Sequence, residues 1–269
     1  MEESFRARYG PWALVAGGSM GMGAAYSRQL AQKGLNVVLV DKAAEPLQTL
    51  ARALADEHGV QTRAVLADLS HPDILKELDA ATHDLEIGLL AYNAAHSIVG
   101  RFLDVSLDDK LRMLDVNCRG PLLFCHHFGM RMVARRRGGI ILVASLSGFQ
   151  GHAMVGTYAA TKAFDLVLGE ALWNELRDHG VDVLAFCPGA TRTEAFLATK
   201  PQPTGRLSAP LMEPDETVAE AIAALGRGPT HIAGRANRLA AFVLHRLLPR
   251  RALVELMSRT TRAMYERRT

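Results

Sequence analysis

The sequence predicts a doubly wound α/β fold: a Rossmann-type parallel sheet of about seven strands with helices on both faces. Three observations predict it. Short apolar runs alternate with longer amphipathic stretches, the apolar runs are nearly continuous, and glycines stand where helices should end. Continuous apolar runs are typical of strands that are buried on both faces. Alternation of such strands with helices gives parallel strands joined by right-handed crossovers.

Six apolar runs rich in β-branched residues are expected to be strands, at residues 13–16, 36–41, 61–65, 87–92, 139–144 and 182–187. The stretches between and after them are expected to be helices, at residues 21–33, 45–58, 73–81, 107–136, 157–179 and 215–225. Ser106, with Asp109 three residues later, and Pro214 are helix-start signals. Gly34, Gly59 and Gly180 are expected to end helices.

Length and composition place the chain among globular proteins. It has 269 residues, 49% of them hydrophobic and 22% charged, and no repeat or linker divides it, so residues 1–235 are expected to form one domain. Within it, residues 190–213 are rich in Pro, Thr and Gly, which favours a lid over the substrate. No secretory signal and no apolar run of ~18 residues is visible, which predicts a cytoplasmic location.

The C-terminal part is basic. From residue 235 onward there are nine arginines against two glutamates. Residues 236–269 are therefore expected to form a basic amphipathic helical tail, packed on the same domain or on a neighbouring subunit. Weak contact with an anionic membrane surface is the alternative. The net charge of +3 indicates no nucleic-acid partner. The three cysteines lack C-x-x-C spacing, so neither disulfides nor a metal site is expected.

Glycines follow the first expected strand in the order Gly17-x-x-x-Gly21-x-Gly23. Glycine lets the backbone turn tightly and approach a pyrophosphate, whose charge the following helix N-terminus attracts. Tight turns need glycine in any case, so the loop alone is weak evidence for a dinucleotide. The other expected cofactor contacts in this loop are Ser19, Met20 and Met22.

Asp41 ends the second strand, eighteen residues after Gly23. A carboxylate there can accept hydrogen bonds from a ribose diol and repels a 2′-phosphate; capping of the next helix is the alternative. Lys42 could tolerate a phosphate, but Ser19 and Met20 add no second basic residue. The expected cofactor is therefore NAD, with NADP less favoured.

Two further strand ends are candidate cofactor contacts. Asp68 and Leu69 follow the third strand, where the carboxylate could hold an adenine amino group or cap the following helix. Asn93, Ala94 and Ala95 follow the fourth strand and could flank the cofactor or form a plain turn.

Tyr158 and Lys162 are four residues apart in an expected helix, so they share one helix face. A cation within about 4–6 Å of a phenol favours its ionised form, which brings the hydroxyl toward the range useful for proton transfer. A lone Tyr-x-x-x-Lys is common by chance, so the other residues decide its meaning.

Taken together, these residues resemble the short-chain dehydrogenase/reductase family in its classical form, from about residue 12 to residue 193. Ser145 precedes Tyr158 by thirteen residues, the usual interval in that family. Ala16 stands where the family commonly has threonine, and Ala95 where it has glycine. The elements that stand in the family's order are Gly17, Gly21, Gly23, Asp41, Asp68, Asn93, Ala94, Asn117, Ser145, Tyr158, Lys162, Pro188 and Gly189.

The resemblance implies roles for the catalytic residues. Tyr158 would be the general acid in carbonyl reduction or the base in alcohol oxidation, and Lys162 would hold the nicotinamide ribose. Ser145 would hydrogen-bond the reacting oxygen, with Ser147 as an alternative. Asn117 would disturb its helix and anchor a water that leads to Lys162. The residues expected to border the nicotinamide are Pro188, Gly189, Thr191 and Thr193.

The expected substrate pocket is mostly apolar, which favours a hydrophobic secondary alcohol or ketone, steroid-, lipid- or acyl-like, over a sugar. Its expected lining is His96, Leu146, Phe149, His152, Met154 and Phe196. The sequence thus predicts an NAD(P)-dependent oxidoreductase that is a homodimer or homotetramer, as is usual in the family. The competing hypothesis is a dinucleotide-binding regulatory or membrane-peripheral protein with little turnover.

Overall fold

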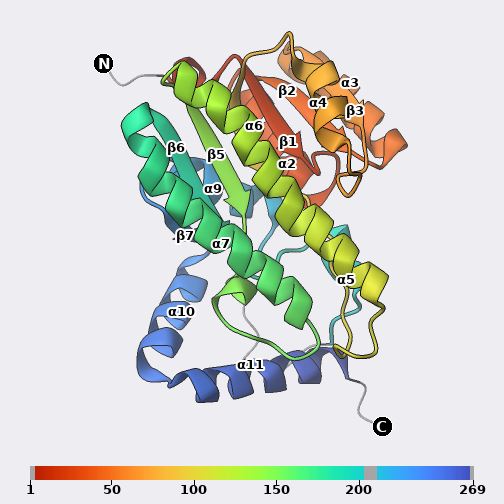
Figure 1. Cartoon of the computed structure of the whole chain (residues 1–269), viewed down its shortest axis with the longest axis vertical. Helices are drawn as coiled ribbons and strands as arrows, with labels where there is room; N and C mark the ends of the chain where they lie inside the picture. The colour runs from red at the N-terminus through yellow and green to blue at the C-terminus, as the bar shows by residue number, and fades with distance from the viewer. Residues whose placement is uncertain (1–3, 203–210, 267–269) are drawn as a thin grey trace.

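Seven parallel strands form one sheet in the order β3-β2-β1-β4-β5-β6-β7, and this confirms the doubly wound α/β prediction. The computed structural model describes residues 4–202 and 211–266. Figure 1 shows the sheet with α6 and α7 across one face and α10 and α11 beyond the end to which β5 points. The strands are β1 (Trp12–Ala16), β2 (Asn36–Asp41), β3 (Thr62–Leu66), β4 (Ile87–Tyr92), β5 (Gly138–Val143), β6 (Val181–Cys187) and β7 (Thr230–Ile232).

The six strands located in the sequence lie within one residue of their predicted bounds. The seventh, β7, was not located, because its three residues are only half-buried. The helices are α1 (Phe5–Tyr9), α2 (Gly21–Gln32), α3 (Ala44–His58), α4 (Ile74–Thr82), α5 (Leu107–Leu114), α6 (Gly120–Ala134), α7 (Gly156–Leu176), α8 (Glu194–Ala198), α9 (Pro214–Ala224), α10 (Arg235–Leu247) and α11 (Arg250–Tyr265).

Alternation of side chains across the sheet builds two apolar cores. Ala13 and Val15 of β1 pack with α2, α3 and α9. Trp12, Leu14 and Ala16 point to the other face, where α4, α6 and α7 cover the sheet. Because successive residues of a strand point to opposite faces, a central strand buried on both sides is apolar at every position.

The expected helix over residues 107–136 is interrupted, which corrects the sequence prediction. Residues Asp115–Arg119 form a π-helical segment, η1, between α5 and α6. A π-helical turn inserts an extra residue into the helix and is frequent at functional sites. The Tyr92 hydroxyl donates to the carbonyl of Val116 in this segment at 2.6 Å, so β4 supports the interruption directly.

The helix-end signals in the sequence are confirmed. The Ser106 hydroxyl accepts from the amide of Asp109 at the start of α5, and Pro214 occupies the first turn of α9. Gly59 and Gly180 follow the preceding helical segments in the left-handed conformation. Within the described residues, no helix combines the length and the apolar character needed to cross a bilayer.

Substitution of two buried tyrosines tests how much the hydrogen bond from Tyr92 of β4 to η1 stabilises the fold. Tyr92→Phe leaves the Val116 carbonyl without this donor, so the free energy of unfolding should fall by about 1–3 kcal/mol. The Tyr26 hydroxyl is buried without a hydrogen-bond partner among the described residues, so Tyr26→Phe should leave stability unchanged or raise it. Urea denaturation of both variants measures the difference; equal losses would contradict this account.

Candidate functional site

The glycine loop after β1 is folded against the ends of β2 and β4. The amides of Gly17 and Gly18 donate to the carbonyl of Val40 at 2.8 and 3.3 Å, and the side-chain amide of Asn93 donates to the Gly17 carbonyl at 3.0 Å. The buried Ser27 hydroxyl donates to the Gly18 carbonyl at 2.9 Å. The sequence prediction missed Ser27, which braces a loop that lacks threonine at position 16.

This loop fits a dinucleotide. A Cβ atom at Gly23 would lie 1.7 Å from the Gly17 carbonyl oxygen, so the tight approach of α2 to β1 requires glycine. The first turn of α2 has no acidic residue, and Met20 gives it no side-chain cap. Its amides can therefore meet a pyrophosphate, as helix N-termini do. Met20 is exposed, whereas Ser19 is buried.

Asp41 lies at the end of β2 and holds the glycine loop. One carboxylate oxygen accepts from the amide and hydroxyl of Ser19 at 3.1 and 2.7 Å. The other accepts from the amides of Lys42 and Ala43 at 2.8 and 3.3 Å. The carboxylate is therefore fixed beside the loop, while the Lys42 side chain is exposed.

Asp68 forms a turn and an ion pair. It accepts from the amide and hydroxyl of Ser70 at 3.0 and 2.7 Å and pairs with Arg112 at 2.6 Å. Burial alone would raise its pKa, but the Ser70 hydrogen bonds and the charges of Arg112 and Lys42 hold the pKa of Asp68 below its usual value. Asp73, not Asp68, precedes α4, so the helix-capping alternative for Asp68 is wrong.

Asn93, Ala94 and Ala95 continue from β4 on the opposite side of the glycine loop. A Cβ atom at Gly17 would lie 2.8 Å from the Cα of Ala94, so the two strand ends are in close contact. Ala95 is exposed. The point where the strand order reverses, between β1 and β4, is where dinucleotides bind in this class of sheet.

Tyr158 and Lys162 lie on the first turns of α7. The Lys162 ammonium nitrogen is 5.9 Å from the centre of the Tyr158 ring, and Tyr158 is half-buried whereas Lys162 is 2% exposed. The same nitrogen donates to the carbonyl of Val143 at 2.7 Å. Val143 ends β5, so this bond ties the lysine to the strand that leads into Ser145.

Ser145 begins a short 3₁₀ helix, η2 (Leu146–Phe149). Its hydroxyl accepts from the amide of Ser147 at 3.1 Å, so the Ser147 amide supports Ser145. The segment packs tightly on α7, because a Cβ atom at Gly148 would lie 2.7 Å from the carbonyl of Lys162. Leu146 also donates its amide to the Pro188 carbonyl at 3.0 Å, which joins the ends of β5 and β6.

Asn117 lies in the π-helical segment and is fully buried. Its carbonyl oxygen accepts from the amide of His96 at 2.7 Å. Its amide group donates to the His96 carbonyl at 2.9 Å and to the Thr161 hydroxyl at 3.0 Å. The implied disturbance of the helix is present, and through it Asn117 joins the loop after β4 to α7.

The segment after β6 folds over the glycine loop. A Cβ atom at Gly21 would lie 3.0 Å from the Thr193 methyl group, and the Thr193 hydroxyl caps α8 by accepting from the Phe196 amide at 3.1 Å. Thr191 is buried and bridges to Met212. These contacts join the two described parts of the expected lid; its residues 203–210 lie outside the described part of the chain.

Polar groups on the expected substrate side are held by the C-terminal helix α11. His152 contacts Gln150 at 2.6 Å and the Thr261 hydroxyl at 3.3 Å, and burial lowers the pKa of His152. The Ser258 hydroxyl accepts from the amide of Ala153 at 3.1 Å. Met154 is joined to the loop after β4, since its carbonyl accepts from the Gly100 amide at 2.8 Å.

Both ends of α11 are also tied to the domain. Arg250 donates to the carbonyl of Phe149 at 2.8 Å. At the other end, the Tyr265 hydroxyl is 3.2 Å from that of Thr199, and Glu266 pairs with Arg101 at 3.2 Å. Because these partners lie in η2, directly after α8 and in the loop after β4, α11 spans the expected substrate side of the site. No sequence signal identified these contacts.

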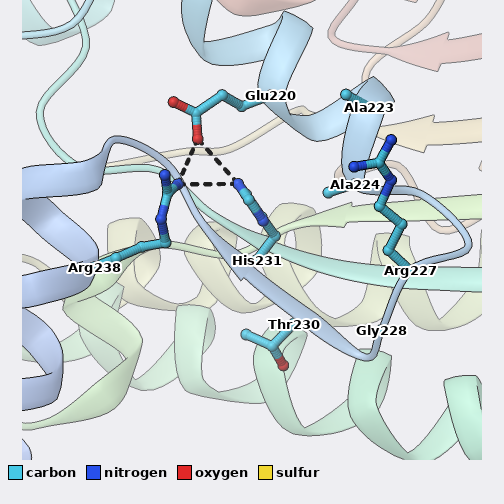
Figure 2. Close-up of a pocket in the computed structure, with 8 residues that line it drawn as sticks. All are labelled: Glu220, Ala223, Ala224, Arg227, Gly228, Thr230, His231 and Arg238. Carbon is cyan, nitrogen blue, oxygen red and sulfur yellow. Dashed lines mark hydrogen bonds and ion pairs between the residues drawn. The ribbon is translucent and has the colours of Figure 1, made fainter.

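A separate hollow of about 340 Å³ lies beside β7, and Figure 2 shows the residues that line it. Glu220 accepts there from His231 at 3.0 Å and from Arg238 at 2.7 Å. Burial alone would raise the pKa of Glu220, but these hydrogen bonds hold it below its usual value. The cluster joins α9, β7 and α10, and none of the predicted site residues lines the hollow.

The sequence of this chain is similar to that of a known protein family. Residues 11–203 match the family described as short chain dehydrogenase. The chain belongs to this family. A 7beta-hydroxysteroid dehydrogenase of Clostridium sardiniense is 33% identical over 235 residues, which are 87% of this chain and 90% of that protein.

Solved structures of family members agree with this assignment. One from a study of 7beta-hydroxysteroid dehydrogenase stereoselectivity has a TM-score of 0.87 and 30% identity, covering 94% of this chain and 99% of its own. A short-chain dehydrogenase from Sphingobium yanoikuyae in complex with NADPH has a TM-score of 0.77 and 32% identity, covering 88% and 93%. The chain is thus a short-chain oxidoreductase that uses a nicotinamide dinucleotide.

Gly23→Ala tests the fit of the glycine loop to the dinucleotide. The added Cβ must push α2 away from Gly17, so NADH affinity should fall at least about tenfold, equivalent to roughly 1.4 kcal/mol. Titration of NADH fluorescence measures the change. Gly228→Ala, where a Cβ meets no atom within 4 Å, should retain normal affinity. Normal NADH binding by a folded Gly23→Ala variant would contradict the assignment.

Proposed function

We propose that this short-chain dehydrogenase interconverts a hydrophobic secondary alcohol and its ketone, with a bulky steroid-like molecule as the substrate. The observation that carries the proposal is the arrangement at the carboxyl edge of the sheet. Tyr158, Lys162 and Ser145 lie there on α7 and after β5, and the glycine loop lies at the same edge, after β1.

The residues that would hold the dinucleotide lie on both sides of the β1–β4 switch point. The N-terminus of α2 would meet the pyrophosphate, Asp41 the adenosine ribose, and Lys162 the nicotinamide ribose. When bound, the nicotinamide supplies or accepts the hydride. Pro188, Gly189 and Thr193 would border it, because the segment after β6 lies over the glycine loop.

Proton transfer would be the work of Tyr158. In the reductive direction its hydroxyl donates a proton to the carbonyl oxygen of the substrate, and in the oxidative direction the phenolate removes the alcohol proton. The Ser145 hydroxyl would hydrogen-bond the same oxygen and stabilise the charge that develops on it. Lys162 would act on both the ribose and the phenol, because its ammonium is held beside the Tyr158 ring.

The substrate class follows from the lining and from the relatives. The lining expected from the sequence includes four apolar side chains, those of Leu146, Phe149, Met154 and Phe196. Of its two histidines, His152 contacts Gln150 and Thr261, whereas the Nε2 atom of His96 is buried without a hydrogen-bond partner among the described residues. A largely apolar lining favours a hydrophobic ligand. The C. sardiniense relative is a 7beta-hydroxysteroid dehydrogenase that shares nearly its whole length with this chain, which supports a steroid-like alcohol.

We further propose a preference for NAD over NADP. The fixed carboxylate of Asp41 would repel a 2′-phosphate, and the buried Ser19 beside it adds no positive charge. Lys42 is the nearest basic group in sequence, and its side chain is exposed. The relative from S. yanoikuyae binds NADPH, so family membership alone does not fix the choice of dinucleotide, and we assign that choice to Asp41 and its neighbours.

A homodimer or homotetramer is also proposed. Large apolar side chains are exposed along α5, α6 and α7, although exposed apolar residues in monomers are usually scattered singly. Burial of this surface against a second copy would remove it from water. The residues are Leu107, Leu111, Leu114, Leu122, Met130 and Val167.

Tyr158→Phe tests the catalytic assignment. Without the hydroxyl, no proton can pass to or from the substrate oxygen, so the turnover number should fall by roughly 10²–10⁴-fold while NADH affinity stays near the native value. Steady-state assays on a panel of hydroxysteroids, fatty alcohols and terpenols, with NAD and NADP, measure the loss. Native turnover in this variant would refute the role of Tyr158.

Asp41→Asn tests the choice of dinucleotide. Removal of the charge should raise NADPH affinity relative to NADH by about tenfold. Asp56→Asn is a matched control, because Asp56 lies near the opposite end of α3 and is exposed; its ratio should equal that of the native protein. An unchanged ratio in Asp41→Asn would contradict the proposed preference.

A further inference from the structure

Lys162 forms a buried ion pair that its place in the family pattern does not explain. Asp165 follows it by three residues on α7, and a carboxylate oxygen lies 3.0 Å from the ammonium nitrogen. Both residues are 2% exposed. The Val143 carbonyl is the second acceptor. Two of the three N–H donors of the Lys162 ammonium are therefore bonded to groups of the protein itself.

The Lys162–Asp165 ion pair is not explained by a contribution to the stability of the fold. Burying a carboxylate is expensive, and a buried ion pair is often no better than apolar residues of the same size. The second oxygen of Asp165 has no hydrogen-bond partner among the described residues, so desolvation is only partly compensated. The presence of a buried carboxylate with an unpartnered oxygen therefore requires a reason other than stability.

The surroundings make Asp165 the counter-charge of Lys162. The ionisable groups that act on the pair from neighbouring elements are Tyr92 on β4, Cys118 on η1, Cys125 on α6 and Cys187 on β6. Burial raises the pKa of Cys118 to about 11 and that of Cys187 to about 12, and it raises the pKa values of Cys125 and Tyr92 further. All four are therefore neutral near pH 7.

On α7 itself, the ionisable group that acts on the pair is Tyr158; Glu170 further along the helix is exposed and accepts from the Thr230 hydroxyl. Burial alone would lower the pKa of Lys162, but the charge of Asp165 and that of an ionised Tyr158 raise it above its usual value. Lys162 thus remains an ammonium. Burial raises the pKa of Asp165, while the charge and the hydrogen bond of Lys162 act in the opposite direction. The ion pair at 3.0 Å is the geometry that favours the carboxylate form of Asp165.

We propose that Asp165 is a positioning residue that holds the ammonium of Lys162 and offsets part of the positive charge that reaches the Tyr158 hydroxyl. The inference deepens the proposed function, on which its catalytic meaning rests. A lysine without this partner would favour the phenolate more strongly. With Asp165 present, Tyr158 keeps its proton to higher pH.

The consequence is that Asp165 favours carbonyl reduction over alcohol oxidation at neutral pH, because it keeps Tyr158 protonated. Carbonyl reduction needs the protonated phenol: the O–H bond of Tyr158 breaks, its proton forms the O–H bond of the alcohol, and the cofactor's hydride forms the new C–H bond. Alcohol oxidation needs the phenolate. Asp165 therefore extends reduction to higher pH and moves the onset of oxidation in the same direction.

Asp165→Asn tests the proposal because it keeps the size and an acceptor oxygen while removing the charge. Ionisation of Tyr158 is followed without cofactor or substrate, as the ultraviolet absorbance difference between each protein and the same protein carrying Tyr158→Phe. The half-ionisation pH should fall by roughly one unit in Asp165→Asn. Asp165→Glu, which restores a carboxylate, should return it toward the native value.

The pH profile of carbonyl reduction gives the second readout, and its alkaline limb should shift by the same amount. If Asp165→Asn does not fold, Asp165→Ser is measured in its place. A lower melting temperature with no shift in half-ionisation pH would show a merely structural role and overturn the proposal, as would a shift to higher pH. The titration needs no turnover, so it decides this point even if the proposed reaction is not found.

Discussion

The arrangement at the carboxyl edge of the sheet depends on one constraint, a fully buried ammonium group. A lysine without solvent must find acceptors inside the protein, and Lys162 finds them on Val143 and Asp165. The bond to Val143 fixes the distance between α7 and the end of β5, which brings Ser145 to the same edge as Tyr158. The requirement to satisfy one charge therefore positions two other side chains, and the packing of Gly148 on the backbone of α7 makes that arrangement rigid.

The π-helical segment completes this edge from the other side. Its extra residue breaks the regular hydrogen bonding of a long helix, and the Tyr92 hydroxyl provides a donor for the Val116 carbonyl in that segment. Asn117 in turn fixes the backbone of His96 and reaches Thr161 on α7. The loop after β4, the interrupted helix and α7 are thus one hydrogen-bonded unit, so displacement of any one of them would disturb the others.

The sequence allowed prediction of the elements whose pattern is local. Six strands were located within one residue because a strand buried on both faces is apolar at every position, and several helix ends carried a capping residue, a proline or a glycine. The short strand β7 has no apolar run, so no pattern marked it. The break at residues 115–119 was implied only by Asn117 in its family position, since π-helical turns have no propensity signal of their own.

The site residues predicted from the sequence are those with a family position, whereas the residues that support them in the structure have no such position. Ser27, Thr161 and Asp165 act through distances between helices and strands, which spacing along the chain does not encode. Asp165 in particular has the sequence appearance of an ordinary polar helix residue. The contacts of α11 were missed for the same reason, because an amphipathic basic helix can pack on its own domain, on another subunit or on a membrane.

Helix α11 contacts three separate segments near the proposed site, although it is encoded far from the glycine loop in the gene. The glycine loop and Asp41 are encoded before residue 100, whereas α11 is encoded after residue 249. If α11 borders the substrate as proposed, mutations in it would change which molecules are accepted while the glycine loop and Asp41 stay intact. Evolution can in this way retune substrate range by remodelling a single helix, without risking the capacity for hydride transfer.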